Sequence, residues 1–432
     1  MNYEETLAYL YEQLPMFSRI GASAIKKDLT NTLALCEALG NPQNKFKTIH
    51  IAGTNGKGST SHFLSAIFQT AGYKTGLYTS PHIKDFRERI RINGELCSKE
   101  FVVDFVARIK PAMEKIAPSF FEITVAMAFE YFAQANVDIA IIETGLGGRL
   151  DSTNVILPEL SVITNIGWDH MDLLGDTLAK IAGEKAGIIK PNVPVVIGEY
   201  VEETLPVFQE KANKEHAPLV LASEERKVIA SQYLGQTIIV EVESESSKQK
   251  NTYTLDLPGI YQTKNLLTVL AAIDEMNKKG WNISNEIIQK AGQNIKNLTG
   301  LHGRWEVLQN NPVLVSDVGH NKNCMIEIAK QIKLSQFNHL YIICGFVKDK
   351  DFDSALLELP ADATYFYTRA HIPRALDETS LLEEATKIGR PGTAFPDVNT
   401  AIEHAKSIAS KEDMILVCGS VFLVAEIDDK WK

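Results

Sequence analysis

The chain has 432 residues, and because domains of about 100–200 residues are usual, this length predicts two or three domains. Hydrophobic residues make up 45% and charged residues 23%, which is typical of globular proteins and excludes disordered, collagenous and coiled-coil classes. The 44 Lys and Arg against 54 Asp and Glu give a net charge of −10, so we expect neither nucleic acid nor a membrane as the main partner.

The N-terminal stretch Met1–Gln13 is acidic and lacks the basic start and apolar core of a signal peptide. No apolar run reaches the roughly 18 residues of a membrane span. The cysteines are odd in number and never form a C-x-x-C pair, which disfavours a disulfide framework and a zinc site. They are Cys36, Cys97, Cys324, Cys344 and Cys418. We therefore expect a reduced, cytoplasmic protein, with a monomer as the default assembly.

In the first half of the chain, short β-rich runs alternate with turn residues and helical patterns. Each run is nearly all apolar, as expected when helices cover both faces of a parallel sheet. The predicted strands are Thr48–Ala52, Thr75–Tyr78, Val137–Ile142, Ser161–Asn165 and Pro194–Ile197. This alternation predicts an α/β fold, with a doubly wound parallel sheet in the first domain.

The pattern changes between about Ala217 and Leu257. Two more polar, alternating strands are predicted at Thr237–Val242 and Thr252–Leu257, and the charged run Glu241–Lys250 lies between them. We expect this segment, about residues 217–257, to be an antiparallel appendage of the first domain.

Two helical stretches, Thr263–Asn277 and Ser284–Asn294, lead to a break at Asn297–Gly303, where we place the domain boundary. Beyond it the βα rhythm resumes. The strands predicted there are Val313–Asp317, Leu340–Cys344, Thr364–Thr368 and Met414–Cys418. The sequence thus predicts a first domain over residues 1–298 and a smaller, Rossmann-like α/β domain over residues 299–432.

A glycine-rich segment follows the first predicted strand and precedes an apolar-periodic helix, and this context favours a phosphate-binding loop. Lys57 would neutralise the β- and γ-phosphates of ATP, and the hydroxyl of Ser59 or Thr60 would face Mg²⁺. The spacing differs from the standard G-x-x-x-x-G-K-[ST], so a purely structural turn remains the alternative. The segment is Gly53, Thr54, Asn55, Gly56, Lys57, Gly58, Ser59 and Thr60.

Seven segments together resemble the folylpolyglutamate synthase/dihydrofolate synthase family, relatives of the peptidoglycan Mur ligases. They span nearly the whole chain in order, which makes the series far more specific than any one member. They are Gly53–Thr60, Gly76–His82, Glu143–Asn154, Thr164–Gly175, Glu184–Lys190, His302–Trp305 and Asp317–Asn321. The resemblance implies a Mur-ligase-like ATP-binding domain followed by a glutamate-ligase domain.

Glu143 ends a predicted strand, and its carboxylate is a hard oxygen donor suited to Mg²⁺. Taken alone, such a residue is more often solvated or a cap. The resemblance implies magnesium binding, with two ions expected, by the residues that match the family's ligands: Ser80, Glu143 and His170. Without it, His170 would be interpreted as a general base or a structural loop histidine.

Lys185 is expected to be chemically modified. A lysine beside divalent metal ions is repelled unless it is neutral, and a neutral amine reacts with CO₂ to give a carbamate. The resemblance implies this carbamylated lysine as a further metal ligand. The alternative is a surface lysine paired with Glu184 or Glu143.

The run Gly145-Leu146-Gly147-Gly148-Arg149 is too rich in glycine for a helix and predicts a loop that approaches a ligand closely. Arg149 then offers a planar fork to a carboxylate or a pterin. The resemblance implies a pteroate site that also includes Phe121, Glu122 and the segment around Gly21–Lys26. A structural turn with a solvated arginine is the alternative.

In the second half of the chain, the resemblance implies that Arg304 and Asp317 contact the nucleotide and that Asn265 contacts adenine or ribose. Asp317 alternatively caps the next helix. His320 is expected to position the incoming amino acid.

These features together imply an ATP-dependent ligase: a carboxylate of dihydropteroate or folate is phosphorylated, and L-glutamate attacks the acyl phosphate. Lys57, Lys185, His170 and His320 are the expected catalytic residues. One alternative is a Mur-type ligase acting on a UDP-sugar peptide. Another is a nucleotide-binding module without ligase chemistry, which leaves His170, Lys185 and Arg149 unexplained.

Overall fold

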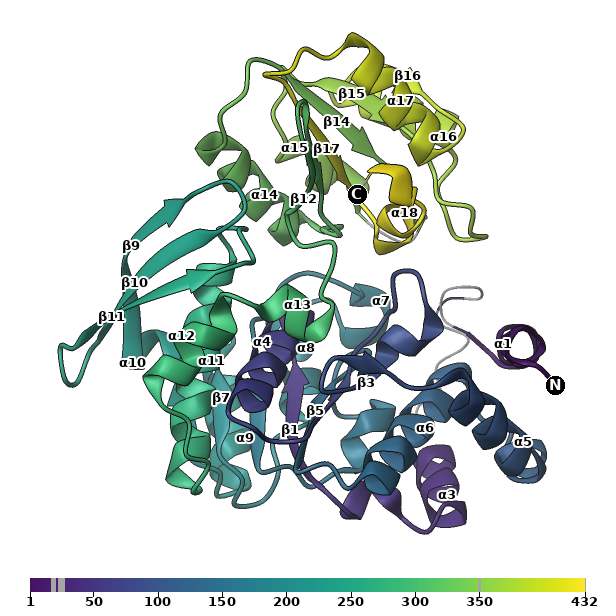
Figure 1. Ribbon diagram of the computed structural model, residues 1–432, viewed down its shortest axis with the longest axis vertical. Helices are drawn as coiled ribbons and strands as arrows, with labels where there is room; N and C mark the ends of the chain where they lie inside the picture. The colour runs from purple at the N-terminus through teal and green to yellow at the C-terminus, as the bar shows by residue number, and fades with distance from the viewer. Residues whose placement is uncertain (17–20, 22–27, 349–350, 432) are drawn as a thin grey trace. The chain divides into compact units, whose positions relative to one another are not determined.

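The computed structural model describes residues 1–16, 21, 28–348 and 351–431 (Figure 1). The chain forms two compact units, each with its own parallel sheet. Unit 1 consists of Met1–Ala230, Val240–Thr254 and Thr263–Gly300, and unit 2 consists of Ser231–Ile239, Leu255–Gln262 and Leu301–Lys432.

Unit 1 contains an eight-stranded sheet in the order β4-β3-β2-β5-β1-β6-β7-β8. The six strands β2-β5-β1-β6-β7-β8 are parallel to their neighbours. Strands β3 and β4 are added antiparallel at the β2 edge. This confirms the predicted doubly wound sheet. The strands are β1 (Lys47–Ala52), β2 (Thr75–Tyr78), β3 (Ile90–Ile92), β4 (Glu95–Leu96), β5 (Ile139–Glu143), β6 (Leu160–Ile163), β7 (Val195–Ile197) and β8 (Leu219–Leu221).

Apolar side chains on both faces of this sheet are covered by helices, which is why its strands are nearly all apolar. One cluster packs Ile142 of β5 against α5 and α6, and another packs Ile163 of β6 against α8 and α9. The helices of unit 1 are α1 (Tyr3–Gln13), α3 (Thr30–Ala38), α4 (Lys57–Thr70), α5 (Lys99–Ile116), α6 (Phe120–Ala135), α7 (Met171–Leu174), α8 (Leu178–Ala186), α9 (Leu205–Lys214), α10 (Ala222–Glu225), α11 (Gln262–Lys278), α12 (Asn285–Gly292) and α13 (Ile295–Thr299).

Helix α6 shows how local sequence sets these elements. Ser119 and Glu122 form a capping box, in which each side chain accepts from the other's backbone N–H. The helix ends at Asn136, which adopts the left-handed conformation. Helix α6 therefore starts and stops at residues that favour helix ends.

Three further strands form a separate small sheet in the order β11-β10-β9. They are β9 (Arg226–Tyr233), β10 (Ile238–Ser244) and β11 (Lys250–Leu255). The two strands predicted in this segment coincide with β10 and β11 within one or two residues. Alternate residues of β10, starting at Ile238, are buried, as the alternating sequence predicts.

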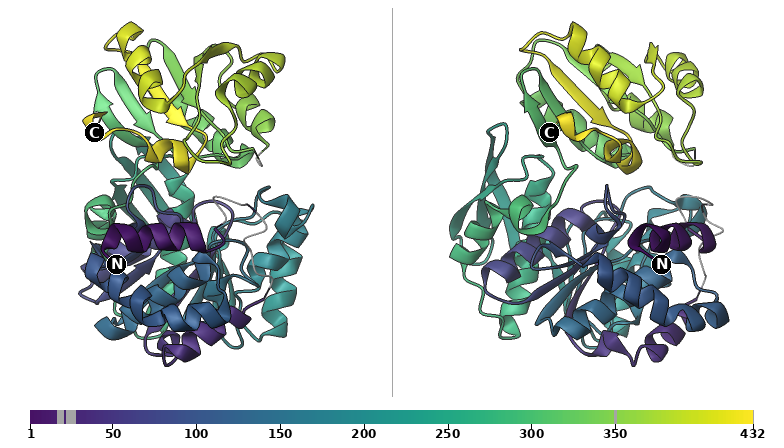
Figure 2. Two further views of the ribbon diagram at one scale, coloured as in Figure 1. Left: turned by 90° about the vertical axis from the view of Figure 1, so that its right-hand side faces the viewer. Right: turned by 45° about the vertical axis from the view of Figure 1, so that its right-hand side comes forward.

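Unit 2 contains a six-stranded sheet in the order β12-β13-β17-β14-β15-β16, parallel except for the edge strand β12. Helices flank this sheet on both sides (Figure 2). The strands are β12 (Glu306–Asn310), β13 (Val313–Ser316), β14 (Leu340–Cys344), β15 (Thr364–Tyr367), β16 (Gly392–Ala394) and β17 (Met414–Cys418); the helices are α14 (Lys322–Leu334), α15 (Phe352–Leu357), α16 (Glu378–Lys387), α17 (Val398–Ile408) and α18 (Val421–Ala425). The predicted break at residues 297–303 differs, because α13 continues to Thr299 before Gly300 turns left-handed.

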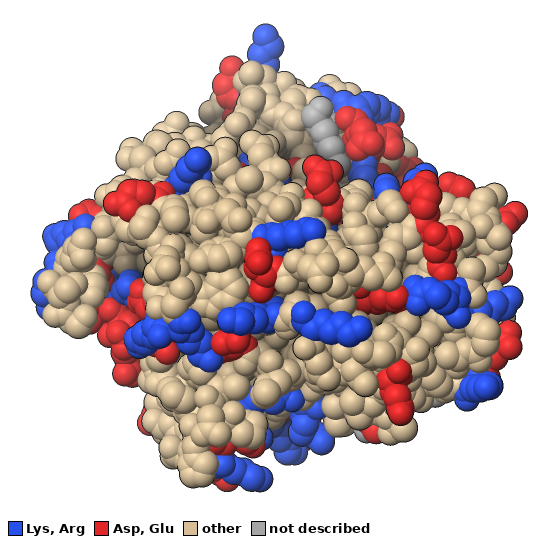
Figure 3. All heavy atoms as spheres, turned by 60° about the horizontal axis from the view of Figure 1, so that its bottom comes forward, with Lys and Arg blue, Asp and Glu red and all other residues tan. Residues whose placement is uncertain are grey.

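The face drawn in Figure 3 intersperses basic and acidic side chains. None of the helices among the described residues has the length and apolar character needed to cross a membrane.

Candidate functional site

Four neighbouring parallel strands of unit 1 bring the predicted ligands to one edge of the sheet. In the order β2-β5-β1-β6, their carboxyl ends lead to Ser80, Glu143, the phosphate loop and His170, respectively. The register places Ile51 of β1 beside Glu143. This edge, where strand order reverses around β1, is where open α/β sheets bind ligands.

The loop between β1 and α4 needs glycine at two positions. Gly53 and Gly56 have φ values of +148° and +81°. A Cβ on Gly53 would lie 1.9 Å from Thr164 Oγ1, and one on Gly56 would lie 2.4 Å from Asn265 Oδ1. The structure therefore places Asn265 against the phosphate loop.

The loop after β6 is held against the phosphate loop by side chains to which the sequence analysis gave no role. Asn165 Oδ1 accepts from the Asn55 N–H (2.9 Å), and the Thr164 hydroxyl donates to the Asn55 carbonyl (2.6 Å). The Thr54 hydroxyl accepts from the Gly167 N–H (2.9 Å). The segment that leads to His170 is thus fixed relative to the phosphate loop.

Two lysines converge on one carbonyl of the phosphate loop. The Gly53 carbonyl accepts from Lys57 Nζ (3.1 Å) and from Lys185 Nζ (2.9 Å), and Lys57 Nζ also donates to the Thr54 carbonyl (3.2 Å). Lys185 is only 3% exposed, and burial, followed by the charge of Lys57, lowers its pKa to about 7. The buried position is inconsistent with the surface-lysine alternative.

Glu143 and His170 provide a carboxylate and an imidazole at this edge. Glu143 is 4% exposed, and His170 adopts the left-handed conformation directly before α7. No three His, Cys, Asp or Glu side chains among the described residues form a metal-binding group. A metal ion here would therefore also need hydroxyl oxygens, ligand oxygens or a modified lysine. The buried Thr60 hydroxyl has no hydrogen-bond partner within the described parts of the chain.

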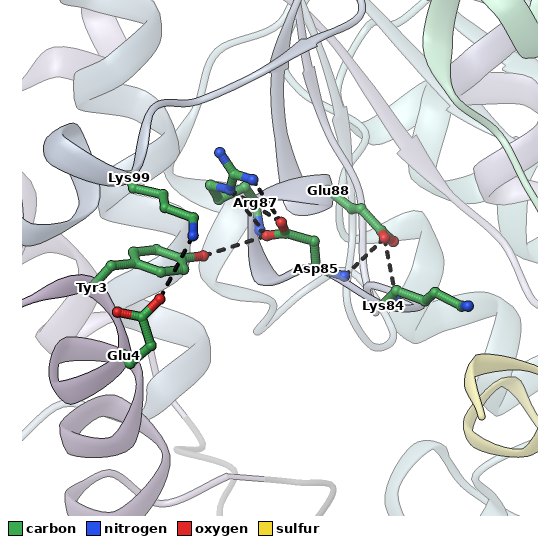
Figure 4. Close-up of polar contacts among 7 residues, drawn as sticks. All are labelled: Tyr3, Glu4, Lys84, Asp85, Arg87, Glu88 and Lys99. Carbon is green, nitrogen blue, oxygen red and sulfur yellow. Dashed lines mark hydrogen bonds and ion pairs between the residues drawn. The ribbon is translucent and has the colours of Figure 1, made fainter. Parts of the chain in front are cut away.

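The loop that carries Ser80 is held by Glu88, whose contacts with Lys84 and Asp85 are drawn in Figure 4. Its carboxylate accepts from the N–H groups of Ile83 (2.7 Å), Lys84 (3.0 Å) and Asp85 (2.9 Å). These three bonds fix the chain directly after the predicted metal ligand.

Asp151 supports the glycine-rich loop after β5. Its Oδ2 accepts from the N–H groups of Gly145 and Leu146, both at 2.8 Å, and its Oδ1 accepts from the Thr153 hydroxyl. Because that hydroxyl donates to Asp151, its contact of 2.8 Å with His50 requires His50 Nε2 to be the donor. Burial lowers the pKa of His50 to about 3. This link from β1 to the glycine loop was missed by the sequence analysis.

The expected pteroate residues lie in different environments. The Phe121 ring would be 2.5 Å from a Cβ on Gly145, so it packs against the glycine loop. Glu122 is buried and caps α6 by accepting from the Ser119 N–H (2.6 Å). Arg149 is more than half exposed and pairs with Glu184 (2.8 Å). In the early segment expected to join them, residues 22–26 lie outside the described part of the chain.

The candidate residues of unit 2 gather after β13. Asp317 is 3% exposed and accepts from the Tyr261 hydroxyl (2.6 Å) and from the N–H groups of Trp305 (2.9 Å) and Gly319 (2.8 Å). Burial raises the pKa of this carboxyl group. The cap of α14 is instead Asn321, so the capping alternative for Asp317 is wrong.

The two neighbouring candidates make backbone contacts. Arg304 donates to the carbonyls of His302 (3.3 Å) and Gly303 (3.2 Å), and His320 Nδ1 lies 3.0 Å from the Val318 carbonyl. The structure thus groups Arg304, Asp317 and His320 in one part of unit 2.

Two family models match the chain. The Mur ligase middle domain matches residues 51–273, and the Mur ligase glutamate ligase domain matches residues 303–421. Together they span nearly all of the eight-stranded, three-stranded and six-stranded sheets described above.

Relatives are similar over the whole length. The dihydrofolate synthase/folylpolyglutamate synthase of Bacillus subtilis is 32% identical and covers 100% of this chain and 99% of its own. Among solved structures, Escherichia coli FolC in complex with DHPP and ADP has a TM-score of 0.85 at 29% identity, covering 98% of this chain and 96% of that one. An FPGS–AMPPCP–folate complex has a TM-score of 0.83 at 27% identity, covering 100% and 99%.

Proposed function

The chain belongs to the folylpolyglutamate synthase/dihydrofolate synthase family, and we propose that it joins L-glutamate to dihydropteroate, to folates or to both through an acyl phosphate, releasing ADP and phosphate. ATP-dependent ligation of glutamate to folates is the activity that the whole-length relatives support. The observation that carries the proposal is the glycine loop with Lys57 at the sheet edge that also holds Glu143, His170 and Lys185.

The phosphates of ATP are proposed to lie on the loop Gly53–Thr60. Its backbone N–H groups at the start of α4, together with the helix dipole, favour an anion. Lys57 Nζ contacts loop carbonyls at 3.1 and 3.2 Å and can exchange these neutral acceptors for phosphate oxygens. Asn265, which lies against Gly56, is proposed to contact adenine or ribose.

Ser80, Glu143, His170 and a carbamate on Lys185 are proposed to hold magnesium. The oxygen donors suit this ion, and the buried Glu143 carboxylate lies at the edge next to the phosphate loop. Bound Mg²⁺ would neutralise charge on the transferred phosphoryl group. The buried Lys185 amine, bonded to the Gly53 carbonyl, would become anionic by adding CO₂ and releasing a proton.

The reaction is proposed to proceed in two displacements. A carboxylate oxygen of the pterin substrate attacks the γ-phosphorus while ADP leaves, and Lys57 stabilises charge on the phosphoryl oxygens. The neutral amine of glutamate then attacks the acyl carbon, and phosphate leaves. Phe121 and the glycine loop are proposed to bind the pterin, with Arg149 and Glu122 beside them. The nucleotide and amino-acid contacts expected for Arg304, Asp317 and His320 stay predictions.

We also propose domains at residues 1–298 and 299–432 and a cytoplasmic monomer. The small sheet β9–β11 would belong to the first domain as its appendage. Light scattering on the purified chain tests the monomer directly, and a mass of twice 47.9 kDa would contradict it.

Isotope transfer tests the chemistry. The chain is incubated with ATP, L-glutamate and dihydropteroate labelled with ¹⁸O in its carboxylate. The expected products are ADP and ¹⁸O-labelled inorganic phosphate, because the labelled oxygen stays on phosphorus when the acyl phosphate breaks down. Formation of AMP and pyrophosphate would contradict the mechanism. ADP release without either co-substrate would instead favour a nucleotide-binding module, and a parallel run with tetrahydrofolate defines the acceptor range.

A further inference from the structure

Arg89 is a buried cation in the loop region that carries Ser80. It ends a short 3-10 helix (Phe86–Arg89) directly before β3. Its carbonyl accepts from the Thr79 N–H (3.2 Å), so its backbone lies beside the Thr79–Ser80 segment. The residue is only 7% exposed.

The groups that directly contact the Arg89 guanidinium are neutral. Its Nε donates to His82 Nδ1 (2.8 Å), the Phe120 ring lies below it at 5.3 Å, and the Tyr78 hydroxyl is a further neighbour. Across residues 1–16, 21, 28–348 and 351–431, no Asp or Glu oxygen lies within 4.0 Å of its nitrogens. Because a guanidinium stays protonated in proteins, the site holds a buried positive charge without a protein carboxylate.

The two nearby arginines show how this sequence otherwise satisfies such a group. Arg87 binds Asp85 through Nε (3.1 Å) and through its terminal nitrogen (2.7 Å), as Figure 4 shows. Arg91 donates to the Gly94 carbonyl (3.0 Å). Arg89 is thus the arginine of this segment whose charge is matched by neither a carboxylate nor a carbonyl among the described residues.

The neighbours of Arg89 connect it to both parts of the proposed site. Thr79 precedes Ser80, the proposed metal ligand, and Phe120 precedes Phe121, whose ring packs against Gly145 of the glycine loop. The contacts of Arg89 therefore include residues that adjoin both the proposed metal ligand and the proposed pterin site.

We propose that Arg89 binds the reacting carboxylate of the pterin substrate and supplies the positive charge that this group meets in the site. This inference rests on the proposed function. A planar guanidinium orients a carboxylate through paired N–H donors, and an anionic ligand compensates the cost of burying the cation. The substrate class is a pterin that ends in a carboxylate, as dihydropteroate and folates do.

The test compares two ligands on two proteins. Dissociation constants are measured by equilibrium binding for dihydropteroate and for its analogue without the carboxylate, with wild type and Arg89→Met. We expect dihydropteroate to bind the variant about 10- to 100-fold more weakly, and the analogue to bind both proteins equally. Equal weakening of both ligands, or full retention of the preference for the carboxylate, would overturn the inference.

Thermal stability separates ligand binding from a structural role. Replacing a buried cation that has no carboxylate partner among the described residues by an apolar side chain of similar length should leave the melting temperature unchanged or raise it. A lower melting temperature together with equal loss of both ligands would assign Arg89 to the fold. If Arg89→Met does not fold, Arg89→Lys keeps the positive charge without the paired N–H donors of the guanidinium. It should bind dihydropteroate about tenfold more weakly and the analogue as tightly as wild type. An equal effect on both ligands would contradict the proposal.

Arg87→Met is the matched control, because its guanidinium already has Asp85 as partner. It should keep the preference of wild type for the carboxylate-bearing ligand. If wild type binds neither ligand, the proposed function itself is overturned. If wild type binds and turns over dihydropteroate but Arg89→Met still prefers dihydropteroate to the analogue, only the role of Arg89 is overturned.

Discussion

The carboxyl edges of the two parallel sheets differ in how their polar groups are satisfied. At the edge in unit 1, Lys57 and Lys185 both donate to the Gly53 carbonyl, a neutral acceptor. At the edge in unit 2, the Asp317 carboxylate accepts from three donors at 2.6–2.9 Å. At the first edge two lysines donate to a neutral carbonyl, whereas at the second edge a carboxylate is surrounded by donors.

This contrast teaches that a strand-end position alone does not identify a ligand-binding residue. Both edges belong to doubly wound sheets, where ligands generally bind. What distinguishes them is whether the hydrogen bonds present already match the charge of the side chain. We therefore expect the lysines to act mainly on activity and Asp317 to act mainly on stability.

The largest expected effect is that of Lys57→Ala. Activity should fall at least about 10³-fold, because the variant lacks the cation placed at the β- and γ-phosphates. Steady-state ADP release measures the loss, and circular dichroism should show an unchanged fold. The matched control is Lys45→Ala, because Lys45 is exposed and lies two residues before β1, the strand that leads to the phosphate loop. A Lys57→Ala variant that keeps more than a tenth of wild-type turnover would show that the phosphate site lies elsewhere.

The activity of Lys185→Ala should be about 10²-fold lower than that of wild type, because the substitution removes the proposed carbamate. Partial recovery on addition of a short carboxylic acid, which can occupy the vacated space, would support an anionic oxygen at this position. The control is Lys180→Ala on the same helix, whose amine is exposed and pairs with Asp176. If NMR of the magnesium- and nucleotide-loaded enzyme with ¹³C-bicarbonate shows no carbamate signal and Lys185 is an unmodified ammonium, the proposed carbamate is contradicted.

Asp317→Asn should lower the free energy of unfolding by about 2 kcal/mol, because a neutral amide replaces a buried carboxylate that accepts from three donors. The urea midpoint measures this, with the exposed Asp362→Asn as control in unit 2. Tyr261→Phe should account for part of the same loss in a double-mutant cycle. Normal stability with reduced ATP binding would instead make Asp317 a nucleotide contact and would remove the contrast between the two edges.

At pH 7 the smallest expected effect is that of His50, which links β1 to the glycine loop and alters stability only as the pH falls. Its folded pKa is about 3, against an ordinary value of 6.5, so below pH 6.5 the unfolded chain binds a proton that the folded chain does not. Stability is therefore full above pH 6.5 and falls towards pH 3, by up to about 1.4 kcal/mol per pH unit from this group.

Urea denaturation at pH 7, 6 and 5 measures this dependence. In His50→Gln the slope of stability with pH should be smaller than in wild type, while exposed His404→Gln should keep the wild-type slope. Equal slopes for His50→Gln and wild type would show that His50 is protonated normally in the folded chain.

Much of the fold was predictable because its strands are short apolar runs between turns. The predicted Thr75–Tyr78 coincides with β2, and Leu340–Cys344 coincides with β14. Strands β3, β4, β8 and β16 were not predicted, since runs of two or three residues carry little periodicity, and the longer strands β9 and β12 were also missed.

Within the site, the sequence predicted residue types but not their supports. The bond between His50 and Thr153 joins residues 103 apart, and that between Asn55 and Asn165 joins residues 110 apart, so no local pattern indicates either. Glu122 is different, because Ser119 and Glu122 match the capping-box pattern S-x-x-E, which indicates a helix cap. That local signal was available, whereas the long-range contacts required the folded chain.

The close approach of Gly53 to Thr164 has a consequence for how this sequence can vary. A methyl group at position 53 would lie 1.9 Å from the Thr164 hydroxyl, and that hydroxyl also holds the Asn55 carbonyl. No side chain at position 53 therefore fits while Thr164 is retained, and shortening Thr164 to make room would release the loop that it holds. A substitution at one of the two positions therefore requires a substitution at the other. Among variants of this chain the residue types at positions 53 and 164 should be statistically linked, although 111 residues of sequence separate them.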